Sequence, residues 1–257
     1  MIVVHRLGDP PGPRIQIAAQ IWREPEWDGL LTALPNIQAA LLVCPRAPSK
    51  DYDGRIRALR FACPMLPLVL SVRSSTSDVR SLSGFADQLL VSGRRLPDVD
   101  HVVRACSRAR WLRGFDRRIE GATTMDPRLR RLLRTGLANA VPITLVRAFA
   151  EAGAVSSATA ERYWREHWCG EPPLRLADYL AWIALLRIHA AKAPRTSWKG
   201  VTGQLRVRRR RILRWVKSYL DLPQLDAFEA LPTAALDVRV ERRVCDHLLR
   251  PAREAGG

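Results

Sequence analysis

The sequence predicts an α/β domain with a parallel sheet, followed by an all-α domain that contains two helix-turn-helix units. In the first half, short apolar runs of strand length alternate with segments of helical periodicity, a pattern typical of strands joined by crossover helices. From Asp126 onward the strand pattern ends, and helical periodicity continues to Leu249 with breaks at prolines. Two segments of this second half also follow the same pattern at an offset of 52 residues.

Residue patterns place five strands and four helices in the first half of the chain. The strands are expected at residues 2–5, 15–21, 39–44, 68–72 and 88–91, and the helices at residues 27–34, 52–62, 77–85 and 99–109. Residues 8–14 are rich in Pro and Gly and too few for a crossover helix, so the first two strands should be joined irregularly. We expect the α/β domain at residues 1–115, a linker at 116–125, the all-α domain at 126–222 and a C-terminal helical extension at 223–257.

Positive charge is concentrated in the second half of the chain. Residues 1–115 carry 16 basic and 10 acidic side chains, a net charge of +6, whereas residues 116–257 carry 26 and 15, a net charge of +11. Arginine far outnumbers lysine, and its guanidinium can engage two phosphate oxygens at once. The charge balance therefore favours a polyanionic partner for the second half, although a GC-rich coding sequence would also raise the arginine content.

No motif in the sequence indicates catalysis, a cofactor or a bound metal. Phosphate-binding loops, dinucleotide-binding glycine patterns, nucleophile elbows and zinc-protease motifs are all missing. The five histidines are isolated and the five cysteines lack a CxxC pair, so neither a metal site nor a disulfide framework is expected. Apolar runs are far shorter than the ~20 residues of a membrane span, and the N-terminus lacks a signal-peptide pattern. We therefore expect a cytoplasmic protein that is not an enzyme and has no membrane partner.

Residues 144–165 and 196–217 share one apolar pattern, in which a short helix, a turn with a valine and a second helix follow each other. The inward positions of the first copy are Val146, Phe149, Ala150, Gly153, Ala160, Tyr163, Trp164 and His167. Those of the second copy are Trp198, Val201, Thr202, Leu205, Ile212, Trp215, Val216 and Tyr219. The aromatic members could instead stack on single-stranded bases, but their place on the apolar stripe favours core packing.

The outward faces of the two second helices are the candidate DNA-binding surfaces. In the first copy these positions are Ala158, Arg162 and Arg165, with Thr159 beside them and Ser156 or Ser157 as the helix cap. In the second copy they are Arg210, Arg214 and Lys217, with Arg208, Arg209, Arg211 and Lys199 beside them. Six arginines fall within the nine residues 206–214. A solvated charge run is the alternative, but the interleaved apolar residues favour a packed helix with a basic outer face.

Residues 174–193 are predicted to form one long amphipathic helix between the two copies. Leu176, Tyr179, Leu180 and Ile183 would line its apolar side. Twenty residues of helix span ~30 Å, which is close to the ~34 Å turn of B-DNA. A connector of this length would let the two copies meet the same face of a duplex.

Residues 126–220 resemble the AraC-type DNA-binding domain, in which two helix-turn-helix units are joined by a long connector helix. The matching segments are residues 145–168, 174–193 and 198–219. Arg206 departs from the pattern, because such turns favour glycine at this position for its freedom to adopt a positive φ. The resemblance implies sequence-specific binding to double-stranded DNA and a role in transcription regulation.

The first 110 residues resemble a response-regulator receiver domain that has lost its chemistry. A receiver needs acidic residues after its first strand, an acceptor Asp at the end of its third, a Ser or Thr after its fourth and a Lys after its fifth. Here Asp9 is the only acid near the first position, Cys44 stands in the place of the acceptor, Ser71 fits and Ser92 replaces the Lys. The resemblance therefore implies a pseudo-receiver that forms a homodimer or binds an unknown partner. For Cys44, a buried thiol is favoured over a redox sensor.

Two other functions remain open at the level of sequence. A low-specificity nucleic-acid-binding protein, structural or associated with a mobile element, would need a similar basic surface. A signalling adaptor would use the helical half to bind protein. A preference of roughly 10³-fold or more for one duplex sequence over random DNA would favour the regulator.

Overall fold

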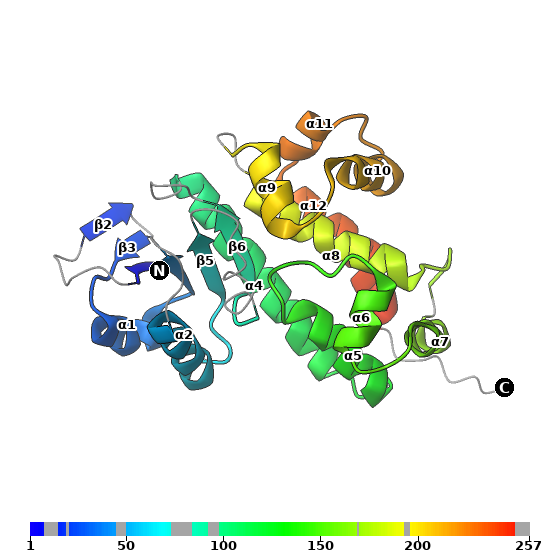
Figure 1. The fold of residues 1–257 in the computed structure, drawn as a ribbon, viewed down its shortest axis with the longest axis horizontal. Helices are drawn as coiled ribbons and strands as arrows, with labels where there is room; N and C mark the ends of the chain where they lie inside the picture. The colour runs from blue at the N-terminus through cyan, green and yellow to red at the C-terminus, as the bar shows by residue number, and fades with distance from the viewer. Residues whose placement is uncertain are drawn as a thin grey trace.

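The protein is described by a computed structural model that covers residues 1–7, 15–18, 21–44, 50–72, 84–91, 98–168, 170–192 and 196–249. An α/β region is followed by a helical region, as the sequence predicts, and the two lie side by side (Figure 1). The strands are β1 (Ile2–Arg6), β2 (Ile15–Ala18), β3 (Ile21–Arg23), β4 (Ala39–Cys44), β5 (Leu68–Val72) and β6 (Gln88–Val91). The helical elements of this region are α1 (Trp27–Ala33), the 3-10 turn η1 (Leu34–Asn36), α2 (Lys50–Ala62) and α4 (Val99–Glu120).

The strands form one sheet in the order β2-β3-β1-β4-β5-β6. Strands β3, β1, β4, β5 and β6 pair in parallel, whereas β2 pairs antiparallel with β3 at the edge. Without β2, the parallel strands have the order of the flavodoxin-like doubly wound sheets. The prediction of a single strand at residues 15–21 is wrong, because the chain reverses between β2 and β3. No Gly or Pro marks this reversal in the sequence.

Helices cover both faces of the sheet. Leu30 of α1 and Ile56 and Leu59 of α2 belong to the apolar cluster on one face. The cluster on the other face takes Val102 and Ala105 from α4. Strands buried on both faces read as continuous apolar runs rather than alternating ones, which explains the pattern that predicted them.

Two of the receiver-like positions are visible in the sheet. Cys44 ends β4 and Ser71 lies in β5, and both side chains are buried. Burial raises the pKa of the Cys44 thiol to about 12, which opposes a redox-sensing role. Asp9, Ser92 and the expected helix as far as residue 83 lie outside the described residues.

After residue 126, every regular element in the described part of the chain is helical. Its elements are α5 (Pro127–Leu137), α6 (Val146–Ala152), α7 (Ser157–His167), α8 (Leu176–Ala191), α9 (Trp198–Leu205), α10 (Arg209–Leu220), α11 (Leu225–Glu229), α12 (Thr233–Val240), the π-helical turn η2 (Glu241–Cys245) and α13 (Asp246–Leu248). Pro142, Pro173 and Pro223 lie between successive helices, and Pro232 caps α12. Among the described helices, none has the length and apolarity needed to cross a membrane.

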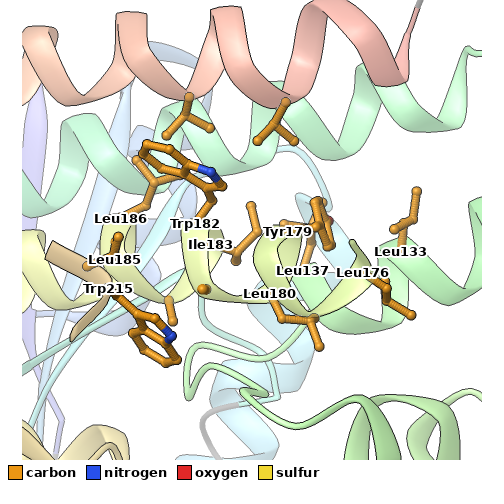
Figure 2. Packing of buried hydrophobic residues seen from close by; sticks show 14 of the residues in the cluster. Leu133, Leu137, Leu176, Tyr179, Leu180, Trp182, Ile183, Leu185, Leu186 and Trp215 are labelled. Carbon is orange, nitrogen blue, oxygen red and sulfur yellow. The ribbon is translucent and has the colours of Figure 1, made fainter. Parts of the chain in front are cut away.

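Helix α8 is the centre of the helical region, and the prediction that it is amphipathic is wrong. Every residue of α8 except Ala177 is buried. Leu133 and Leu137 of α5 and Trp215 of α10 pack around it (Figure 2). A helix that is apolar on all sides belongs inside a core, and this pattern is present in its sequence. Its 16 residues span ~24 Å rather than the expected ~30 Å.

The expected linker, residues 116–125, contains the last turn of α4 and the connection to α5. Leu112, Phe115 and Ile119 of α4 belong to the same apolar cluster as α8. Phe228 of α11 and residues of α12 and α13 join that cluster too. Segments on both sides of residues 126–222 therefore contribute to one helical core.

Buried polar groups also join the sheet to α8. The fully buried Arg187 of α8 donates hydrogen bonds to the backbone carbonyls of Asp87 and Leu137, the latter at 2.7 Å. The Gln88 side chain of β6 donates back to the carbonyl of Arg187 at 3.0 Å. These bonds hold the edge of the sheet directly against the central helix.

Candidate nucleic-acid interface

The pairs α6–α7 and α9–α10 repeat one another at the offset of 52 residues seen in the sequence. Ala154 and Arg206 occupy equivalent positions in the two turns, and both have φ of 55°. Arg206, which stands where such turns favour glycine, therefore does adopt the left-handed conformation. For an L-residue this conformation costs roughly 1–2 kcal/mol.

The same backbone hydrogen bond closes each turn. The amide of Val155 donates to the carbonyl of Ala150 at 3.0 Å, and the amide of Val207 donates to the carbonyl of Thr202 at 3.1 Å. Each of these residues lies 52 positions after its counterpart. The weak sequence repeat is therefore a structural repeat.

The predicted inward faces of both pairs are packed into the helical core. The buried members are Phe149, Ala150, Ala160, Tyr163, Trp164, Val201, Leu205, Ile212, Trp215 and Val216. The half-buried members are Val146, Gly153, His167, Trp198, Thr202 and Tyr219. Trp164 stacks on Trp168 with ring centroids 5.2 Å apart. These rings act as core residues, as predicted, and are not presented to solvent for base stacking.

Ser156, not Ser157, is the cap of α7. Its hydroxyl accepts a hydrogen bond from the amide of Thr159 at 3.1 Å. Ser157 and Thr159 are half-buried, while Ala158, at the outward start of the helix, is exposed. The start of α7 thus presents small neutral side chains.

The rest of the outer face of α7 carries both signs of charge. Arg162 and Arg165 are exposed, as predicted, but so are Glu161 and Glu166. The Nε atom of Arg162 lies 3.8 Å from Oε1 of Glu166, and the Nε of Arg165 donates to the carbonyl of Glu161 at 3.4 Å. The exposed charges of α7 therefore balance, and its basic character is weaker than the arginines alone suggested.

Helix α10 carries only positive charge. Its sequence contains no acidic residue. The exposed cations at its start and along its outer face are Arg208, Arg209, Arg210, Arg214 and Lys217, and Lys199 is exposed on the preceding helix. This is the most basic helical surface among the predicted contact residues.

Arg211 differs from its neighbours, because it is half-buried and bonded within the protein. Its guanidinium donates to the hydroxyl of Thr144 at 3.1 Å. It also lies 5.9 Å from the ring centroid of Trp215. Arg211 therefore ties α10 to the segment that precedes α6, and its role as a contact residue stays a prediction.

The start of α10 is left without a side-chain cap. Arg208 is the residue before the helix, and its side chain accepts no hydrogen bond from the helix amides. Positive side chains near a helix N-terminus are opposed by the helix dipole, which favours anions there. Uncapped amides beside three arginines are instead well suited to a phosphate group.

The other end of α10 is fixed to α8 by a contact that the sequence did not reveal. The Tyr219 hydroxyl donates to Oδ1 of Asp178 at 2.8 Å, and Arg175 donates to both oxygens of that carboxylate at 3.0 Å. Burial alone would raise the pKa of Asp178, but these hydrogen bonds outweigh burial and hold the pKa below its usual value. The partners are 41 residues apart, so no local pattern could predict the pairing.

The central helix α8 runs between the pairs α9–α10 and α6–α7 in Figure 1. The Arg211–Thr144 bond also joins α10 to the segment that precedes α6. Within the described residues, no cluster of His, Cys, Asp and Glu could hold a metal ion. Comparison of the chain with protein-family models, curated proteins and solved structures found no match.

Proposed function

We propose that the chain binds double-stranded DNA and regulates transcription, with α6–α7 and α9–α10 as helix-turn-helix units in an AraC-like arrangement. The observation that carries the proposal is the outer face of α10. It combines five exposed cations, an uncapped helix start and no acidic residue. The receiver-like sheet region is proposed to act as a pseudo-receiver.

The packing of α10 supports the proposal, because the basic face is held rigidly. Ile212 and Val216 are fully buried and Trp215 is 9% exposed, so the opposite face of the helix is fixed in the core. A flexible charged segment would lose conformational entropy on binding, and a helix that is already folded avoids this loss. Each phosphate that such a helix neutralises releases condensed counterions from the duplex, which drives association.

We propose a smaller and different contribution from α7. Its charges balance, so it adds little net attraction to phosphates. Ala158 is exposed at the start of the helix beside the hydroxyls of Ser156 and Thr159, and small side chains there allow close approach to a groove. In this arrangement α10 supplies most of the affinity and α7 supplies positioning.

Selection of bound sites from random duplex DNA, followed by affinity measurements on a selected and a scrambled duplex, tests the proposal. A preference of roughly 10³-fold or more supports the regulator. Equal affinity for both duplexes would favour the alternative of a low-specificity nucleic-acid-binding protein. The absence of binding to any duplex would contradict both functions.

A further inference from the structure

An open cleft of about 520 Å³ lies between α4 and α5, beside the residue that precedes β6. It is far from α10 in sequence and is not among the predicted contact surfaces. Its charged lining consists of Arg113, Arg130, Arg131 and Arg134 together with Asp87 and Asp116. Arginines thus outnumber carboxylates two to one in the cleft.

The carboxylates of the cleft are already occupied. Asp87 accepts hydrogen bonds from Arg113, from Arg60 at 3.0 Å and from the amide of Leu68 at 2.8 Å. Asp116 accepts a hydrogen bond from Arg134 at 3.0 Å. These pairs neutralise Arg113 and Arg134 but leave no carboxylate of the lining for the other two arginines.

Arg130 and Arg131 are the arginines whose charge remains uncompensated. Among the described residues, the partners of the Arg130 guanidinium are backbone carbonyls, those of Glu120 at 3.2 Å and Ala122 at 3.3 Å. Arg131 is exposed, and its guanidinium makes no hydrogen bond or ion pair with another described residue. Both guanidiniums line the same cleft and are available to a negatively charged ligand.

A further positive charge lies behind the wall of the cleft. Arg187 is fully buried, and its hydrogen-bond partners are the carbonyls of Asp87 and Leu137, two residues of the lining. Burial lowers the pKa of Arg187 to about 10, so the side chain stays cationic at neutral pH. The nearby charge of Asp87 offsets part of this effect of burial. A buried charge is costly to desolvate, and an anion in the adjacent cleft would offset more of this cost.

We propose that this cleft binds a small multivalent anion that carries phosphoryl or carboxylate groups. Its volume falls within the range of about 300–1,000 Å³ typical of small-ligand sites, which often lie between structural regions. The planar guanidinium matches the two oxygens of either group. The site joins the start of β6 to α4 and α5, so the bound anion would stabilise the contact between the sheet and the helical region.

The test uses the full chain, with inorganic pyrophosphate and citrate as probes in separate calorimetric titrations at constant ionic strength. Saturable binding of one equivalent is expected, together with a rise in unfolding temperature beyond that given by matched NaCl. Arg131→Gln should weaken binding about tenfold or more, the loss expected for one charge-assisted hydrogen bond. Arg57→Gln is the matched control, because Arg57 is exposed on α2 and pairs with Asp53 at 2.8 Å, away from the cleft lining.

The two probes and a variant of α10 separate the outcomes. Binding of pyrophosphate alone, or of citrate alone, assigns the ligand to the phosphoryl or the carboxylate class. Arg210→Ala should keep the affinity of the full chain for the probe, so a failure of the DNA proposal would leave this result unchanged. Failure of both probes to bind saturably, or wild-type affinity in Arg131→Gln with the fold intact, would overturn the proposal.

Discussion

The exposed arginines of α10 can be removed with little effect on folding. Arg210 and Arg214 are exposed, and their guanidiniums make no hydrogen bond or ion pair with another described residue. Arg210→Ala and Arg214→Ala should therefore change the free energy of unfolding by no more than about 0.5 kcal/mol. For Arg210→Ala the change should be slightly stabilising, because a positive charge is removed from the first turn of a helix.

The same substitutions should weaken DNA binding by a predictable amount. Loss of one phosphate contact lowers the slope of log K against log salt by ~0.9. The charge-assisted hydrogen bond itself contributes ~1.5–3 kcal/mol, or roughly 10-fold to 100-fold in affinity. A base contact would instead relax sequence preference at one position, by ~1–3 kcal/mol.

Trp215→Ala provides the contrast, because Trp215 lies on the inward face of the same helix. Its side chain is 9% exposed and packs near Leu185 of α8 (Figure 2). Loss of the buried ring should destabilise the protein by ~3–5 kcal/mol. Its DNA affinity should fall only as far as its folded fraction falls.

Urea unfolding and fluorescence anisotropy with a selected duplex at several salt concentrations distinguish the two faces. Arg57→Ala, on α2, is the control for loss of one exposed arginine elsewhere. If both α10 arginine variants keep wild-type affinity and salt dependence while folded, α10 is not part of the interface. A cost below about 1 kcal/mol for Trp215→Ala would contradict the packing described for this helix.

Three other substitutions or truncations test the fold. The pKa of His189 is lowered from 6.5 to about 4, mainly by burial and secondly by the nearby charge of Arg108. The unfolded chain therefore binds a proton at this histidine more readily than the folded protein does. Stability should fall as the pH drops from about 6.5 to about 4, and His189→Gln should reduce this dependence in a thermal-unfolding series. Arg206→Gly should raise the unfolding free energy by about 0.5–1 kcal/mol in urea, since glycine adopts φ of 55° without steric cost; a loss would contradict the turn geometry. A fragment of residues 98–257 should fold, whereas one of residues 120–257 should not show cooperative unfolding, because it lacks the part of α4 that belongs to the helical core.

Much of the architecture was predictable because apolar periodicity is a local signal. Continuous apolar runs predicted the parallel strands, because these strands are buried on both faces. Prolines predicted the limits of the later helices. The reversal between β2 and β3 was missed, because the sequence there continues an apolar pattern without a turn residue. The prediction that α8 is amphipathic was wrong for a different reason. It considered the apolar residues on one face of the helix and ignored those on its other faces, such as Trp182 and Leu185.

The candidate interface was predictable in its residues but less so in their roles. Exposure of Arg210 and Arg214 follows from helical spacing alone. The bond from Arg211 to Thr144 spans 67 residues, and only the tertiary structure shows that this arginine is bonded within the protein. The cleft was not predicted, because the arginines of α5 share it with Arg113 of α4 through packing that residue spacing does not reveal.

Helix α8 bonds both to the proposed DNA-binding helix α10 and to the residue beside the proposed anion site. Near its start, α8 presents Asp178 to Tyr219 of α10, and near its end Arg187 holds the residue that precedes β6. The C-terminal end of the proposed DNA-binding helix α10 is therefore bonded to the same buried helix that contacts the proposed anion site, whereas Arg211 ties the first half of α10 to the segment that precedes α6. Substitutions inside α8 would therefore disturb both sites at once through the core. Only changes on the exposed faces, at α10 or in the cleft, can assign an effect to one site.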